Sequence, residues 1–155
     1  MPRAENGLTL VDLLVTLMVT VILGLIGNMA LQGFLANFRV RSAAREVVTT
    51  LHLARMRAVS QNTTHRVMFN VDARSYQLAD GQSVSLPPGV RFNRDGADPI
   101  TFTADEATFS PTGTSNGGRI FLRGLKEQQR YCIRVNPLTG RVRLQKVQTS
   151  WTECD

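Results

Sequence analysis

The basic residues near the end of this sequence carry its clearest chemical pattern. Residues 119–155 contain eight Lys and Arg against three acidic residues, whereas residues 59–118 contain four against six. In the basic region Gly140 is followed by Arg141 and, two positions later, by Arg143. Side chains two positions apart share a face of a β-strand, so these two arginines are expected to project together. Clustered guanidinium groups are suited to binding phosphate.

A neighbouring strand is expected to add to this group. Residues 130–136 and 141–147 both predict strands, and the segment between them, with its proline and glycine, predicts a hairpin loop. The hairpin would bring a third arginine across from the first two, with a lysine in support and a glycine shaping the turn. The expected DNA-binding set is Gly140, Arg141, Arg143, Lys146 and Arg134.

Like charges on one face of a sheet destabilise it slightly. A cluster of arginines on one face is therefore expected to serve a function other than folding. No helix-turn-helix, zinc finger or aromatic ladder is evident for reading bases. We therefore expect non-specific contact with the phosphate backbone of DNA. The alternative is a solvated surface, or arginines that pair with acidic residues of a neighbouring subunit.

Other kinds of site are not indicated. The sequence has no Gly-x-Ser-x-Gly, no glycine-rich phosphate loop and no HExxH, so no enzymatic activity is expected. His52 and His65 do not stand at ligand spacing with either cysteine, and neither a metal nor a cofactor is expected.

The expected secondary structure begins with a long apolar run. Between residues 10 and 36 the only charged residue is Asp12. About 20 such residues cross the hydrocarbon core of a bilayer, so a membrane anchor is expected over residues 8–38. A secretory signal peptide has a shorter apolar stretch, and a buried core helix is the remaining alternative. An acidic residue inside an apolar helix is costly, which makes Asp12 a candidate functional residue.

The segment Gly7-Leu-Thr-Leu-Val-Asp12-Leu-Leu14 resembles the processing site of type IV pilins and type II secretion pseudopilins. The resemblance implies a leader of residues 1–7, which prepilin peptidase removes by cutting between Gly7 and Leu8 before it methylates the new amino terminus. It also implies that Asp12 pairs with the terminal amine of a neighbouring subunit during assembly. Leu8 stands where the family usually has Phe, and Asp12 where it usually has Glu.

The same resemblance implies a location and a set of partners. A single-pass inner-membrane protein is expected, with its C-terminal domain in the periplasm and later in a pilus. Arg3 precedes the apolar run while Arg39, Arg41 and Arg45 follow it, so the positive-inside rule alone would favour the opposite orientation. The expected partners are DNA, the membrane, the peptidase and other pilin subunits that contact the N-terminal helix.

The helix is expected to continue as an amphipathic segment over residues 39–60. Its apolar residues recur at steps of three and four, which is the helical period: Val40, Ala44, Val47, Leu51, Ala54 and Ala58. Residues 61–155 then alternate short strand patterns with turns and predict a β-rich globular domain. The expected fold class is α+β: a pilin fold in which one long helix packs on an antiparallel β-sheet.

Two cysteines, Cys132 and Cys154, stand late in this chain. A disulfide is expected in a domain that faces the oxidising periplasm, and it would pin the C-terminal tail to the penultimate strand. Two unrelated free thiols are the alternative. Trp151 is expected to cover the disulfide rather than to stack on a base.

The globular part resembles one subgroup, the GspH/FimT minor pseudopilins. The resemblance rests on Phe109-Ser-Pro-Thr-Gly113, on a strand pattern at residues 120–122 and on the final hairpin with Gly140-Arg141. FimT-type members bind DNA through a Gly-Arg-x-Arg motif, which Gly140-Arg141-Val142-Arg143 matches. The resemblance implies a minor type IV pilin that supports DNA uptake in natural transformation. The alternative is a GspH-like structural subunit of a type II secretion pseudopilus, without a nucleic-acid role.

Overall fold

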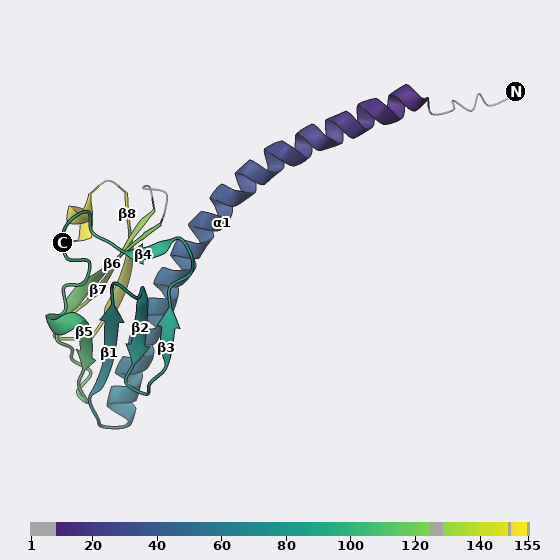
Figure 1. Cartoon of the computed structure of the whole chain (residues 1–155). Coiled ribbons are helices and arrows are strands. Elements are labelled where there is room, and N and C mark those ends of the chain that lie inside the picture. Colours follow the sequence, from purple (N-terminus) through teal and green to yellow (C-terminus); the bar gives the residue numbers. More distant parts are fainter. Residues whose placement is uncertain (1–8, 125–128, 149, 155) are drawn as a thin grey trace, which may run out of the picture. The chain divides into compact units, whose positions relative to one another are not determined.

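The computed structural model describes residues 9–124, 129–148 and 150–154, without the side chains of residues 25–32, 152 and 153. Over these residues the chain forms one long helix, eight strands and two short 3-10 helices (Figure 1). The helix, α1 (Leu10–Ser60), precedes all the strands. Two compact units, Met1–Leu35 and Ala36–Asp155, divide the chain, and α1 contributes to both.

The start of α1 in the first unit is capped by a reciprocal pair of side chains. The Thr9 hydroxyl donates a 2.7 Å hydrogen bond to Asp12 Oδ2, and the Thr9 backbone N–H donates to the same oxygen at 3.2 Å. The backbone N–H of Asp12 donates in turn to Thr9 Oγ1 at 3.3 Å. This is a capping box, in which two backbone donors at the helix start are satisfied by the two side chains. Asp12 therefore has a local role in starting the helix, which sequence analysis did not anticipate.

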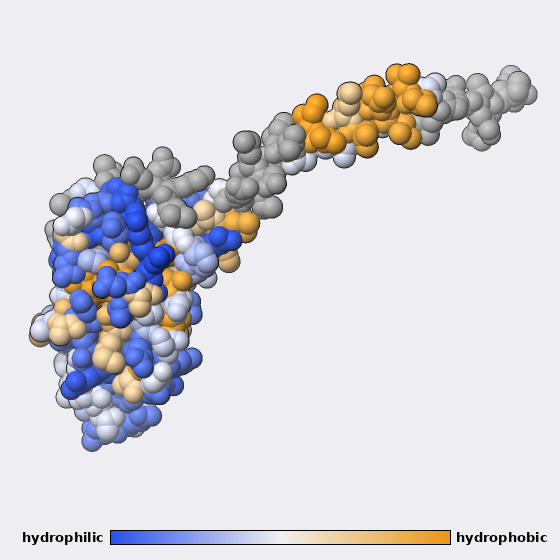
Figure 2. Space-filling view, in the orientation of Figure 1, coloured by the Kyte–Doolittle hydropathy of each residue, from blue (hydrophilic) through white to orange (hydrophobic). Residues whose placement is uncertain are grey.

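The first turns of α1 expose apolar side chains on all sides. Between Leu10 and Leu23 every large apolar residue is exposed, by 45% or more of its surface (Figure 2). Over the described residues, no helix combines the length and the apolarity needed to cross a membrane. Anchoring by residues 8–38 stays a prediction, and the predicted cleavage site at Gly7 and Leu8 lies outside the described residues.

The second half of α1 is amphipathic, as its period predicted. The apolar stripe from Val40 to Ala58 is buried, with each of its six members at most 2% exposed. The helix ends at Ser60 because Asn62 takes a left-handed conformation (φ 51°), and the Thr63 N–H then bonds to the Ala58 carbonyl at 3.2 Å. Asparagine is one of the residues that tolerate this conformation, which ends many helices.

Two four-stranded antiparallel sheets follow the helix, where sequence analysis expected antiparallel sheet without resolving two. The first has the strand order β3-β2-β1-β5 and the second β4-β6-β7-β8. The first sheet comprises β1 (His65–Asn70), β2 (Ser75–Leu78), β3 (Ser83–Ser85) and β5 (Glu106–Phe109). The second comprises β4 (Val90–Phe92), β6 (Gly118–Gly124), β7 (Arg130–Val135) and β8 (Val142–Val147). The 3-10 helices are η1 (Thr103–Asp105) and η2 (Trp151–Cys154).

One core joins the stripe of α1 to both sheets. Phe69 lies near its centre, with the rings of Tyr76, Phe92 and Phe102 at centroid distances of 6.0–6.2 Å. Burial raises the pKa of Tyr76 to about 12, because the charged phenolate would lose its hydration. This core fixes which face of each strand points inward, and so which residues of the second sheet face outward.

Candidate functional site

The hairpin β7–β8 places arginines on the sheet face opposite the core. Its register pairs Arg134 with Arg143 and Val135 with Val142. Both valines are buried in the core, so the alternation of side chains puts Arg134 and Arg143 on the other face, where both are exposed. Arg134 thus lies across from Arg143, the arrangement that the hairpin pattern predicted.

Lys146 does not join this group. It stands three positions after Arg143, so it falls on the opposite face of β8, where it pairs with Tyr131 on β7. The alternation of the strand therefore separates Lys146 from the arginines that it was expected to support.

A cleft of about 710 Å³ opens over this face of the hairpin, and we call it the basic cleft. It is lined by Arg55, Arg134, Arg141 and Arg143, together with Cys132, Asn136, Thr139, Gln145 and Cys154. Arg134 and Arg143 lie one step along the sheet from the pair Cys132 and Gln145. Among the described residues no acidic side chain pairs with Arg141 or Arg143, so both guanidinium groups are available to an anion.

Arg55 of α1 is the member of the cleft that sequence analysis missed. Its Nε–H donates a 3.1 Å hydrogen bond to the Gly113 carbonyl, in the turn before β6. In the sequence Arg55 appears only as one polar residue on the outer side of the amphipathic helix. Arg55 comes close to the arginines of the hairpin, more than 75 positions further along the chain, only because the Gly113 turn packs between α1 and the hairpin loop.

Gly140 has a packing role in addition to its turn conformation. It has a φ of +59°, and its N–H closes the hairpin loop through a 2.8 Å bond to the Asn136 carbonyl. A Cβ at this position would lie 2.2 Å from the Gly113 carbonyl oxygen and 2.9 Å from Arg55 Nε. The hairpin loop, the Gly113 turn and Arg55 therefore meet at a point where only glycine fits.

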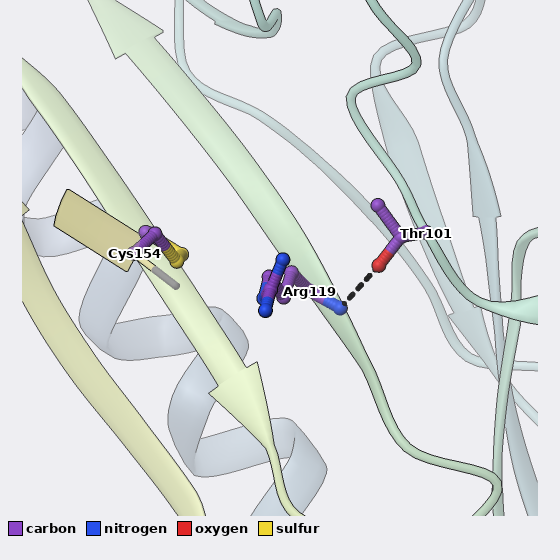
Figure 3. Close-up of a disulfide and its surroundings, with 4 residues drawn as sticks. Thr101, Arg119 and Cys154 are labelled. Atoms are coloured by element: carbon purple, nitrogen blue, oxygen red, sulfur yellow. Dashed lines mark hydrogen bonds between the residues drawn. A yellow bond between two sulfur atoms is a disulfide. The ribbon is translucent and has the colours of Figure 1, made fainter. Parts of the chain in front are cut away.

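A further arginine lies next to Arg134 on the neighbouring strand β6. Arg119 on β6 pairs with Arg134, which pairs with Arg143, so three neighbouring strands each carry an arginine on the outer face. The backbone N–H of Arg119 donates to Thr101 Oγ1 at 2.8 Å, while its guanidinium group lies on the side towards Cys154 (Figure 3). Arg119 does not line the basic cleft, and sequence analysis did not include it.

The other end of the same sheet face holds arginines of a different kind. Asp95 accepts hydrogen bonds from Arg123 and from the Trp151 indole N–H (2.8 Å), and it forms an ion pair with Arg130 (3.3 Å). Arg123 is only 9% exposed. We call these four residues the Asp95 cluster. Both arginines of the cluster bind the same carboxylate, which ties β6, β7 and η2 to Asp95 and gives these arginines a structural role.

The predicted disulfide between Cys132 and Cys154 is present, and it lies between the two groups of arginines. Both cysteines are buried in a small second core with Phe121, Val147 and Trp151. The Trp151 ring packs edge-on against Phe121, with centroids 5.1 Å apart, and is 8% exposed. Trp151 thus covers the disulfide, as expected, and has no free face on which a base would stack.

Comparison of this fold with solved structures defines its class. Two structures of the minor pseudopilin EpsH from the type II secretion system of Vibrio cholerae superpose on it with TM-scores of 0.56 and 0.54, at 14% and 18% identity. They cover 70% and 74% of this chain, and 97% and 98% of their own. The type IV minor pilin FimU of Pseudomonas aeruginosa gives 0.49 at 19% identity, over 72% of this chain and 95% of its own. The matches to the two EpsH structures show that the fold is pilin-like.

Sequence comparison then gives the family. A family model described as "Type II transport protein GspH" matches residues 43–140, which is more than half of the chain. The type II secretion system protein H of Xanthomonas campestris pv. campestris is 27% identical over 143 residues, or 91% of this chain and 83% of that protein. The chain belongs to the GspH family. The predicted resemblance is confirmed at this level, and membership of the FimT type stays a prediction.

Proposed function

We propose that this protein is a minor pseudopilin of the GspH type, a structural subunit that joins other pilin-like subunits through the first half of α1. The observation that carries the proposal is the continuous apolar surface of that half, exposed from Leu10 to Leu23. A helix that is apolar on all sides has to be covered, either by lipid or by neighbouring helices. Family membership and the similarity to a type II secretion protein H support the structural alternative over the DNA-uptake function as the main role.

Processing and location follow the same proposal. Prepilin peptidase would cut after Gly7, residues 8–38 would anchor the chain in the inner membrane, and the β-rich domain would face the periplasm. An oxidising compartment is consistent with the Cys132–Cys154 disulfide.

Site-specific cross-linking in cells that express the secretion machinery tests assembly. A photoreactive residue at Leu17, which is 63% exposed on the first half of α1, should cross-link to pilin-like subunits identified by mass spectrometry. The matched control is Thr49, also exposed but on the second half of α1. If Leu17 gives no more protein cross-links than Thr49, the first half of α1 is not the assembly surface.

DNA binding by the basic cleft is a second candidate function. Its support is the convergence of Arg134, Arg141 and Arg143 in one cleft, where Arg141 and Arg143 have no acidic partner among the described residues. Such a site would bind phosphate groups without reading bases. Affinity from one copy would be weak, so several copies in a filament would have to add to it.

A salt titration of DNA binding by the full chain in detergent tests this candidate. Contacts with three to four phosphates predict a slope of about −3 in a plot of log affinity against log salt concentration. The double variant Arg141→Ala, Arg143→Ala should lose most of the binding and keep its thermal unfolding transition. Absence of wild-type binding at low salt would leave the structural role as the whole function.

A further inference from the structure

We propose that Arg55 of α1 is a phosphate-binding residue of the basic cleft, which joins the helix to the arginines of the hairpin. The proposal deepens the DNA-binding candidate and rests on it. The motif of that candidate, Gly140-Arg141-Val142-Arg143, lies wholly within the hairpin, and nothing in it points to a residue of the helix.

The first argument for this role is the position of Arg55 in the basic cleft. Arg55 lines the cleft together with Arg134, Arg141 and Arg143, so the guanidinium groups come from two separate parts of the fold. A concave site lined by charges of one sign concentrates the field and attracts ligands of the opposite sign. A phosphate held between the helix and the hairpin would therefore meet positive charge from both.

The second argument is the number of hydrogen-bond donors that Arg55 has left for a ligand. The guanidinium group has five N–H donors, and the bond to the Gly113 carbonyl uses the one on Nε. Within the part of the chain that the structure describes, the two terminal nitrogens make no hydrogen bond, which leaves their donors for a phosphate oxygen. Among the described residues no carboxylate pairs with Arg55, so its charge is not neutralised within the chain.

The bond to Gly113 also holds the side chain in place before any ligand arrives. Gly140 approaches both Arg55 and the Gly113 carbonyl so closely that an added Cβ would lie 2.9 Å from Arg55 Nε, so this end of the guanidinium group is packed as well as hydrogen-bonded. A mobile surface arginine loses side-chain conformational entropy when it binds a ligand. An arginine that is already held in place loses less, so its binding costs less free energy.

Nearby arginines of the same helix show that this placement is specific. Arg57, two positions further on, forms an ion pair with Asp80 at 2.5 Å and does not line the cleft. Arg45 is exposed on α1 and also does not line the cleft. Of these three arginines, Arg55 alone combines a cleft position with the lack of a described acidic partner.

Binding of a fluorescent DNA duplex by the full chain in detergent, titrated with salt, tests the proposal. Arg55→Ala should weaken binding about tenfold at low salt and reduce the magnitude of the log–log salt slope by about 1, because one phosphate contact is lost. Arg45→Ala removes the same charge from the same helix outside the cleft, and is expected to stay within about twofold of wild type with an unchanged slope. Thermal unfolding of each variant is recorded alongside.

A second variant separates phosphate contact from support of the loop. Arg55→Lys keeps the charge, but one ammonium group serves the Gly113 carbonyl and a phosphate less well than a guanidinium fork. It should keep the wild-type salt slope at reduced affinity. If Arg55→Lys loses the slope as fully as Arg55→Ala, Arg55 only supports the loop and the proposal is overturned.

The remaining outcomes distinguish this proposal from the one on which it rests. If wild type binds, the Arg141→Ala, Arg143→Ala variant does not, and Arg55→Ala matches Arg45→Ala, DNA binding stands and the role of Arg55 is refuted. If wild type does not bind DNA at low salt, both proposals are refuted together.

Discussion

Arginine residues on the outer face of the second sheet differ in what surrounds them, although the sequence makes them look alike. Arg123 and Arg130 bind Asp95, while Arg141 and Arg143 line an open cleft without a described acidic partner. Arginines that bind an acidic residue of the same chain stabilise a local arrangement, and arginines without such a partner are suited to an outside ligand. The role of each of these arginines therefore depends on the residues around it and cannot be told from its being an arginine.

Gly140→Ala tests the tightest contact at the cleft. The added Cβ would meet the Gly113 carbonyl oxygen at 2.2 Å, and alanine is strained at a positive φ. We expect a loss of roughly 1–3 kcal/mol in the free energy of unfolding, measured by urea denaturation. Gly81→Ala is the matched control, because Gly81 also has a positive φ (+87°) but no atom within 4 Å of an added Cβ. Equal losses in the two variants would show that the contact with Gly113 is unimportant.

Sequence analysis predicted the arginines of the hairpin but not those of the neighbouring elements, for a physical reason. The alternation of strand residues and a short hairpin loop bring Arg134, Arg141 and Arg143 together, because both are local properties of the chain. The same alternation excludes Lys146, which sequence analysis wrongly grouped with them. Arg55 and Arg119 depend on how α1 and β6 pack beside the hairpin, and no local pattern carries that information.

At the scale of elements, the disulfide joins η2 to β7 and holds Trp151 over the second core. The double variant Cys132→Ser, Cys154→Ser opens a loop with a sequence separation of 22, so the free energy of unfolding should fall by about 3 kcal/mol. Trp151 is the single tryptophan of the chain, and its fluorescence should shift to longer wavelength as the ring becomes hydrated.

Reduction of the wild-type protein serves as the control for that experiment. A reducing agent should reproduce both the loss of stability and the fluorescence shift, and it should leave the double variant unchanged. An unaltered Trp151 spectrum in the variant would mean that the Asp95 hydrogen bond and the Phe121 contact hold η2 without the disulfide.

The elements themselves were predictable to different degrees. The amphipathic half of α1 and the hairpin β7–β8 follow from clear periods, and the turn after Ser60 follows from its polar residues. The strand β3 was not predicted, because Ser83-Val84-Ser85 is three residues long and its single apolar side chain is too little to establish a period. The division into two sheets was not predicted either, since strand order depends on pairing between residues distant in the chain.

At the scale of the whole molecule, the α+β class was predictable because one amphipathic stripe and a series of short strands have to bury their apolar faces against each other. The pilin fold was predicted from the resemblance of the segment from Gly7 to Leu14 to pilin processing sites. The stripe of α1 and the inner faces of both sheets form one core, and the sheet that carries the cleft packs on this core. The cleft itself occupies the sheet face that this core does not use. A structural subunit can thus carry a binding surface without altering its scaffold.

The capping box at the start of α1 has a consequence for how a subunit would enter a filament. In a chain cut after Gly7, the new α-amino group stands one residue before Thr9, close along the chain to a carboxylate that Thr9 already occupies. The amine of a neighbouring subunit would then approach a carboxylate whose Oδ2 already accepts two hydrogen bonds from Thr9. On this prediction, docking would give the exposed carboxylate of Asp12 a positively charged partner in the next subunit, in addition to its bonds to Thr9 or in place of them.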